Sequence, residues 1–473
     1  MSKVLLAGAV LAIYLILGTL LAFISRKRLM EGLDDFFTAK GRLGGFLSAM
    51  TYAATTYSGF MIVGLVGFAY YTGVGSLGFE LAYFVATISL LVLFARKVRT
   101  MARERKWITP SQMLGDLLGS RKIAVIVSLI YLVALVPYAA SQLKSIGESI
   151  AGMAGGYYKL GVIIGLIIIV IWSMIAGIWS IAVTDALQGL WMIFSAFLLL
   201  GYVLWIWNTN AGDLASAWTV LKEANLTGLD GFWTLNMFLA FTLPWIFFAV
   251  TNPQVVQRLY MPKDEKSLRD MIRWFGVFGL IYTIIVTLVG LYTRASVEAG
   301  YLSISPTSKD EVTPLLLATM NPLFAGIIFT SIIAASASTA DSILLTLSSV
   351  VAVDLVEGSE VKKKKAALTA IIIVGVVMAA VAISRVSYIV QLSVLSSLIL
   401  LSLAPITIAA WTKGIDNPTL ATLSILTGPI IVAIITIIKG SPLAAFAATL
   451  LGLPIAAWIL LISTILLLPA IKR

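Results

Sequence analysis

The chain has 473 residues, of which 60% are hydrophobic and 12% are charged, with a mean hydropathy of +1.02. This composition excludes a soluble globular protein and indicates a membrane protein with many spans. The net charge of +11 would suggest a nucleic-acid partner in a soluble chain. Here the basic residues lie in short loops between apolar segments, so they report orientation in the lipid bilayer and not nucleic-acid binding.

Cysteine and histidine are both absent. Their absence excludes disulfides, thiolate or imidazole metal sites, and Ser-His-Asp or Cys-His catalysis. The few intramembrane acids do not make a catalytic constellation. We therefore expect a protein that is not an enzyme and has no catalytic residues.

About thirteen apolar segments are long enough to cross a bilayer. They are Val4–Ile24, Phe46–Tyr71, Gly75–Ala95, Ile123–Ala151, Leu160–Ile178, Ala182–Trp207, Phe232–Asn252, Trp274–Thr293, Leu323–Val353, Ala367–Ile383, Ile389–Trp411, Leu420–Ile438 and Pro442–Ala470. Basic clusters occur on alternate loops in a way that predicts an outside N-terminus and a cytoplasmic C-terminus.

Two of these segments contain helix breakers at matching places. Phe46–Tyr71 is interrupted at residues 55–59, and Phe232–Asn252 is interrupted near Pro244 and ends in Asn252-Pro253. Each opens a group of five spans, and because five is odd the groups start on opposite sides of the membrane. Paired broken helices in two inverted halves are typical of a transporter binding site.

The pattern predicts an all-α fold in four parts. Residues 1–41 form an extra N-terminal span with a basic inner loop, 42–207 the first inverted repeat, 232–411 the second, and 412–473 two C-terminal spans.

The stretch Ser331–Leu355 is rich in small residues and hydroxyls. At about 100° per residue, Ser331, Ala335, Ser338 and Ser342 fall on one helical face. Helix packing explains small residues in lipid. It explains Asp341 less well, because an intramembrane carboxylate usually faces an ion, a cavity or a partner. Grouped oxygens of this kind favour a hard cation such as Na⁺.

With these residues in hand, the sequence resembles the sodium:solute symporter family over nearly its whole length. The resemblance is carried by GRLGGFLSAMTYAATTYSG (41–59), AGIWSIAVTDALQG (176–189), NPQVVQRLY (252–260) and AASASTADSILLTLSS (334–349). It implies a leucine-transporter-like fold with an extra N-terminal helix.

The resemblance also implies a sodium site between the first broken helix and the serine-rich helix. Its ligands would be the backbone carbonyls of Ala54, Tyr57 and Ala335 and the hydroxyls of Ser338 and Thr339.

Some family members hold a second sodium ion near an aspartate that Asp185 matches. Ser342 matches one hydroxyl partner, whereas Asp341 stands where those members have serine, so a second site would be altered. The alternative for Asp185 is a helix-end acid at the inner surface that faces a basic residue.

For the solute, the resemblance points to Tyr138 and Trp245, with Pro253 also matching proline-type members. The remaining candidates near these positions are Ser58, Gly59, Gln142 and Ala249. Ala249 replaces a tyrosine, and Thr56 replaces an aspartate, of those members. AMTYAATTYSG is closer to the pantothenate and monocarboxylate branches.

Lys144 lies in the predicted span Ile123–Ala151, four residues before Glu148. An internal ion pair or a snorkelling side chain accounts for such a lysine. The alternative is that Lys144 attracts the carboxylate of a solute.

The combined interpretation is a Na⁺-coupled symporter that imports a small organic solute, an amino acid or another carboxylate, by alternating access. A proton-coupled transporter using Asp185 or Asp341 is the closest alternative. A substrate sensor on a transporter scaffold would normally need a fused signalling domain, and no polar segment here is long enough.

Overall fold

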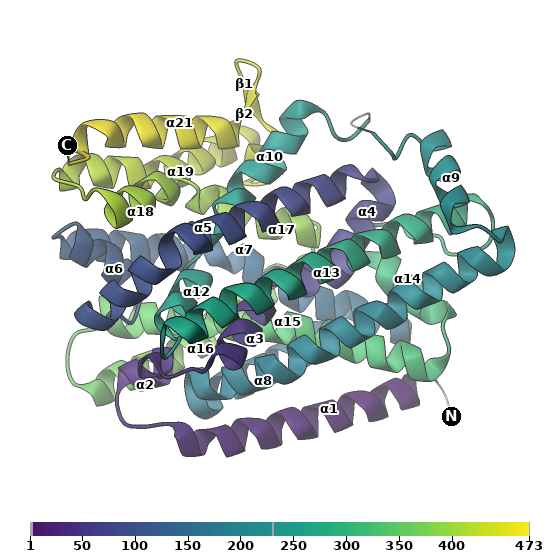
Figure 1. The fold of residues 1–473 in the computed structure, drawn as a ribbon, viewed down its shortest axis with the longest axis horizontal. Coiled ribbons are helices and arrows are strands. Elements are labelled where there is room, and N and C mark those ends of the chain that lie inside the picture. The colour runs from purple at the N-terminus through teal and green to yellow at the C-terminus, as the bar shows by residue number, and fades with distance from the viewer. Residues whose placement is uncertain (1–2, 229–230, 473) are drawn as a thin grey trace.

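The computed structural model describes residues 3–228 and 231–472, and nearly all of them are helical (Figure 1). The first half contains α1 (Lys3–Ser25), α2 (Leu33–Thr38), α3 (Gly45–Thr56), η3 (Phe60–Leu65), α4 (Val66–Thr72), α5 (Gly75–Arg105), α6 (Pro110–Leu117), α7 (Arg121–Ala154), α8 (Tyr158–Ala211) and α9 (Ala217–Glu223).

The second half is also built of long helices and short connections. It contains α10 (Leu235–Ile246), α11 (Phe248–Thr251), α12 (Pro253–Val256), η5 (Gln257–Tyr260), α13 (Glu265–Glu298), η6 (Lys309–Glu311), α14 (Val312–Thr319), α15 (Pro322–Val350), η7 (Val351–Leu355), α16 (Glu360–Ile383), α17 (Ile389–Leu400), α18 (Leu403–Thr412), α19 (Pro418–Lys439), α20 (Ala444–Ala447) and α21 (Ile455–Leu467).

Within the described residues, ten helices are long and apolar enough to cross a membrane, and two bent pairs raise the number to twelve. With the shorter apolar helix Ile455–Ala470, the number of candidate spans reaches the thirteen that the sequence predicts. The two spans predicted at Leu160–Ile178 and Ala182–Trp207 form one continuous helical trace, α8. Gly177 divides it with a φ of +55°, and an added Cβ there would lie 2.3 Å from the Phe36 carbonyl oxygen.

The structure differs from the predicted spans in two places. Ile389–Trp411 is bent by 52° between α17 and α18. Pro442–Ala470 is not one helix, because its first half contains α20 and a two-stranded hairpin of β1 (Thr449–Leu450) and β2 (Leu453–Pro454). Leu451 and Gly452 adopt positive φ at the turn, and Pro454 cannot continue a helix from the hairpin.

The serine-rich α15 lies at the centre of the fold and is buried along nearly all of its length. It packs against α1, α3, α7 and α8 (Figure 1). A helix buried on all sides in a membrane protein does not need an apolar stripe, so its hydroxyls can serve packing or ligands.

Candidate functional site

The first broken helix supplies one wall of the site. α3 ends at Thr56, Tyr57 takes an extended conformation (φ −94°, ψ 111°), and helical structure resumes at Phe60. The two halves, Gly45–Thr56 and Phe60–Thr72, are bent by 47°. Such a break removes intrahelical hydrogen bonds and leaves carbonyl oxygens available as ligands.

The serine-rich helix α15 crosses the end of α3. The Ser338 hydroxyl donates to the carbonyl oxygens of Ala54 and Ala335, both at 2.9 Å, and the Thr339 hydroxyl donates to the Ala54 carbonyl at 3.0 Å. Ala54, Ala335, Ser338 and Thr339 are all fully buried. The structure therefore brings these four residues together, with Tyr57 at the helix end beside them.

The chemistry of this group fits a sodium ion. All of its members offer neutral oxygens, which hard monovalent cations prefer, and the hydroxyl hydrogens can rotate away from an ion. Since the oxygens come from two separate helices, binding would be coupled to the distance between α3 and α15.

Gly59 makes this close approach sterically feasible. An added Cβ would lie 2.3 Å from the Ser336 hydroxyl of α15 and 2.5 Å from the Ser145 hydroxyl of α7. Ser145 and Ser336 are buried and their hydroxyl oxygens have no hydrogen-bond partner among the described residues. The break thus lies directly against two unpaired polar groups.

The three residues predicted for a second sodium ion each have a different hydrogen-bond partner within the protein. The Asp185 carboxylate accepts a hydrogen bond from Thr51 at 2.6 Å, and the Ser342 hydroxyl pairs with Thr55 at 2.8 Å. Asp341 instead accepts a hydrogen bond from Ser173 of α8, at 3.0 Å. Asp341 and Ser342 are neighbours on a helix, so their side chains point about 100° apart.

Arg258 was not expected here, because the sequence places it among the basic residues of the loop after the second broken helix. It lies on η5, is fully buried, and donates from Nη2 to the Ser342 hydroxyl at 2.6 Å. Its guanidinium also lies close enough to Asp185 for the two charges to interact. The sequence feature that could have indicated its burial is its position in NPQVVQRLY, immediately after a span that ends in Asn-Pro.

The candidate solute residues gather around Trp245 on α10. Trp245 is 2% exposed, and its ring centroid lies 6.2 Å from that of Tyr138 on α7. Ser58, at the break, lies beside the Tyr138 hydroxyl. One turn after Tyr138, the Gln142 amide donates to the Tyr138 carbonyl at 3.3 Å while its oxygen has no partner among the described residues.

The two other candidate solute residues, Ala249 and Pro253, follow Trp245 on the second broken helix. Ala249 is buried in the short α11, and Pro253 is the first residue of α12. Asn252 between them takes an extended conformation (φ −87°, ψ 116°) at the predicted end of the span. The interruption predicted near Pro244 falls at Phe247, because Pro244 lies inside α10, which ends at Ile246.

Lys144 belongs to a separate cluster at the other end of α7. The expected ion pair with Glu148 is present at 2.9 Å, and a second links Lys144 to Asp310 of η6 at 3.0 Å. Glu148 also pairs with Arg385 at 3.0 Å. Burial raises the pKa of Asp310, and the Lys144 ammonium opposes that shift. Lys144 is therefore paired with two carboxylates of the protein itself.

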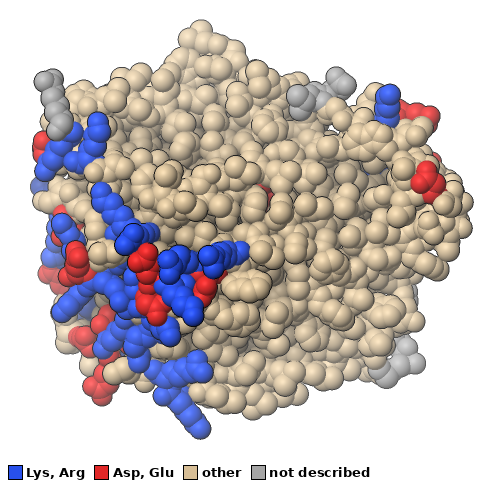
Figure 2. Space-filling model, in the orientation of Figure 1, with Lys and Arg blue, Asp and Glu red and all other residues tan. Residues whose placement is uncertain are grey.

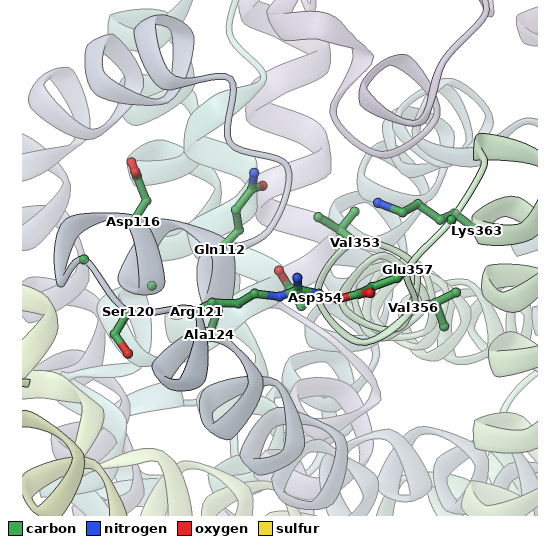
Figure 3. Close-up of a pocket in the computed structure, with 13 residues that line it drawn as sticks. Gln112, Asp116, Ser120, Arg121, Ala124, Val353, Asp354, Val356, Glu357 and Lys363 are labelled. Carbon is green, nitrogen blue, oxygen red and sulfur yellow. Dashed lines mark ion pairs between the residues drawn. The ribbon is translucent and has the colours of Figure 1, made fainter. Parts of the chain in front are cut away.

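A cavity of about 570 Å³ lies at the opposite end of the molecule, between α6, the start of α7 and the segment after α15 (Figure 3). Arg121 and Glu357 form an ion pair across it at 2.5 Å. Asp354 accepts hydrogen bonds from Thr109 at 2.7 Å and Ser111 at 2.6 Å. These bonds satisfy Asp354 and fasten the end of α15 to α6, which indicates a structural role.

The fold and the oxygen-lined break between two helices define a secondary active transporter. A sequence model of the sodium:solute symporter family matches residues 36–413. The chain therefore belongs to this family of secondary active symporters: it is a multi-pass membrane protein and not an enzyme, and Na⁺ is the family's coupling ion.

Named relatives are distant. The osmoregulated proline transporter OpuE of Bacillus subtilis is 26% identical over 352 residues, covering 73% of this chain and 70% of the relative. A sodium/proline symporter of Staphylococcus aureus is 26% identical over 366 residues, covering 75% and 69%. The solved structure of a Na⁺-coupled sialic acid symporter in a substrate-bound outward-open state has a TM-score of 0.81 at 20% identity and covers 99% of both chains. That likeness shows the shared fold.

Proposed function

We propose that the protein imports a small organic solute together with Na⁺, and that the solute is a proline-like amino acid or another small carboxylate such as pantothenate or a monocarboxylate. The observation that carries the proposal is the contact between two helices, in which the Ser338 and Thr339 hydroxyls of α15 donate hydrogen bonds to the Ala54 carbonyl of the broken α3. The names of the two bacterial proline transporters support the amino-acid class.

The mechanism follows from ligands that lie on two helices. A sodium ion that binds Ala54, Tyr57, Ala335, Ser338 and Thr339 stabilises whichever arrangement brings α3 and α15 together. Loss of the ion to the cytoplasm would loosen this contact and open the inner path. The membrane potential contributes about 2.3 kcal/mol per charge per 100 mV to inward movement.

A second ion near Asp185 and Ser342 would have to share the space with the guanidinium of Arg258. Because like charges repel strongly at a buried site, we propose one sodium ion per cycle while Arg258 stays in place. Asp341 takes no part in this site.

We propose that the N-terminus is outside and the C-terminus cytoplasmic, and that residues 42–207 and 232–411 are the two inverted repeats. The basic side chains support this orientation, since they gather at one end of the molecule (Figure 2). The two broken helices near residues 57 and 252 support the repeat boundaries.

The test is uptake into proteoliposomes of labelled proline, pantothenate, lactate and acetate under an inward sodium gradient or a matched proton gradient. Wild type is compared with a Ser338→Ala, Thr339→Ala double variant. Ser348→Ala is the matched control, because this buried hydroxyl on the same helix bonds only within its own helix, to the Leu345 carbonyl.

We expect sodium-driven uptake of at least one compound in wild type and the control, and its loss in the double variant. Uptake that ignores sodium and follows the proton gradient would refute the proposed sodium site. It would direct attention to Asp185 and Asp341 as proton carriers.

A further inference from the structure

A second cavity, of about 530 Å³, lies outside the sodium and solute sites, beside α2 at the end of the molecule where basic side chains gather (Figures 1 and 2). Its walls are η1 (Arg26–Arg28), the connection to α2, α2 itself and the first turns of α16. η1 directly follows α1, and both α1 and α16 are long and apolar enough to span a membrane. The cavity therefore lies where two spans leave the bilayer, at the level of the lipid headgroups.

The floor of this cavity is apolar. Its residues come from the connection after η1, from α2 and from α16, and they are Leu29, Met30, Leu33, Phe36 and Val361. Leu33 and Phe36 are buried, whereas Met30 and Val361 are 53% and 66% exposed. Exposed apolar side chains at this level favour contact with hydrocarbon, and they have no hydrogen-bond donor to offer a free anion.

The rim of the cavity is basic. Arg26 and Lys364 are exposed, and the Lys364 ammonium lies 5.9 Å from the centre of the Phe36 ring, so it reaches over the apolar floor. These cations belong to the basic runs 26–28 and 362–365, and no member of either run takes part in an ion pair formed within 3–228 and 231–472. The acids that line the cavity are Glu31 and Glu360. The two runs contain more basic residues than these acids can neutralise.

Two other cavities that contain basic residues differ from this one. In the cavity of about 570 Å³, Arg121 is paired with Glu357 (Figure 3). In a cavity of about 200 Å³ between α2 and the end of α5, the Arg103 guanidinium donates to the Gly41 carbonyl at 2.9 Å. The protein itself engages these cations, whereas the cations at the rim of the cavity beside η1 remain available to an external anion.

We propose that this cavity binds the headgroup of an anionic phospholipid such as phosphatidylglycerol, taken from the leaflet at the basic end of the molecule. The Arg26 guanidinium and the Lys364 ammonium supply charge-assisted hydrogen bonds to the phosphodiester, and the glycerol backbone and first methylene groups of the lipid cover the apolar floor. A zwitterionic lipid also carries a phosphate, but the basic runs repel its ammonium group. The bound lipid joins the segment after α1 to the start of α16.

The experiment follows the Tm of the purified full-length protein in detergent as dioleoyl-phosphatidylglycerol or dioleoyl-phosphatidylcholine is added. Glycerol 3-phosphate and inorganic phosphate are added in separate arms, which distinguish a lipid from a free anion. Wild type is compared with an Arg26→Gln, Lys364→Gln double variant, in which both changed side chains are exposed. The matched control is Lys122→Gln with Lys413→Gln, which removes the same charge from two exposed residues that do not line the cavity.

We expect phosphatidylglycerol to raise the Tm of wild type and control saturably, and phosphatidylcholine and the two free anions to have little effect. In the double variant, the phosphatidylglycerol concentration for half of the full rise should increase about tenfold or more, because two charge-assisted contacts are lost. The control should stay within about twofold of wild type, since its cations only add to the general surface charge. Neither sodium nor solute is needed, so the result is independent of the proposed function.

Several outcomes would overturn the inference. One is that the double variant responds to phosphatidylglycerol as wild type does, and another is that the control loses the response equally. Saturable stabilisation by glycerol 3-phosphate or inorganic phosphate, at the concentration at which the lipid acts, would assign the cavity to a small anion instead. Native mass spectrometry of wild type with an equimolar mixture of the two lipids requires no variant to fold. Equal retention of phosphatidylcholine and phosphatidylglycerol there would also overturn the inference.

Discussion

At the scale of single residues, the sodium-site candidates came from the resemblance of residues 41–59 and 334–349 to the sodium:solute symporter family. Spacing alone places Ala335, Ser338 and Ser342 on one helical face, and it does not name the carbonyl ligands of the first broken helix. Arg258 could not be assigned in this way. Its role depends on which helices pack around the residue, and a basic residue near a loop does not reveal its neighbours.

The Lys144 cluster gives a prediction at this scale. Lys144→Gln should lower the free energy of unfolding by about 3 kcal/mol, because Asp310 and Glu148 stay buried with less positive charge. The measurement is unfolding of the purified protein in detergent, with the exposed Lys222→Gln as control.

Adding Asp310→Asn to Lys144→Gln should recover part of that loss, since the double variant removes both charges of one pair. Solute KM in Lys144→Gln should change less than twofold. A large rise in the KM for the solute, without a loss of stability, would instead indicate that Lys144 binds the solute.

At the scale of elements, the breaks that sequence predicts are those marked by polar residues or Pro. Residues 55–59 indicate the break in the first of the two broken helices, and Asn252-Pro253 indicates the end of the second. The bend between α17 and α18 falls at Leu401-Ser402, four residues before Pro405. A proline cannot donate the helical hydrogen bond to the carbonyl four residues earlier, so Pro405 is a local signal for this bend, although the prediction of one unbroken span at Ile389–Trp411 did not use it.

The close approach at the first break gives a prediction for helix packing. Gly59→Ala should push α3 away from α15, because the new Cβ would meet the Ser336 and Ser145 hydroxyls. Overpacking of this kind costs about 1–3 kcal/mol, so we expect the sodium concentration for half-maximal uptake to rise about tenfold.

Gly201→Ala on α8 is the matched control, since an added Cβ there meets nothing within 4 Å. It should leave sodium dependence unchanged. Equal sodium dependence in Gly59→Ala and wild type would show that the contact between the break and α15 does not govern ion binding.

At the scale of the whole molecule, charge is distributed very unevenly. Lys and Arg side chains gather at the end occupied by α2 and α6, while most of the visible surface carries no charge (Figures 1 and 2). α1 begins at the opposite end from the one where α21 finishes. The basic loops are far apart in sequence, so their meeting at one end is a property of the fold that the alternation of spans predicts.

The orientation can be tested with single thiols, because the chain contains no cysteine. Ser305→Cys lies between α13 and α14, and Glu104→Cys lies near the end of α5 in the basic region; both positions are exposed. A membrane-impermeant maleimide should label Ser305→Cys on intact cells and Glu104→Cys only after permeabilisation. The reverse pattern would invert the assigned topology.

The burial of the Lys144, Glu148 and Asp310 side chains should make their ion pairs insensitive to ionic strength. Surface pairs such as Arg96–Glu265, with 76% and 45% exposed side chains, weaken as ionic strength rises. The buried cluster, with side chains at most 7% exposed, is hardly screened. The sodium salt that drives transport should therefore leave the strength of the ion pair between Lys144 of α7 and Asp310 of η6 almost unchanged.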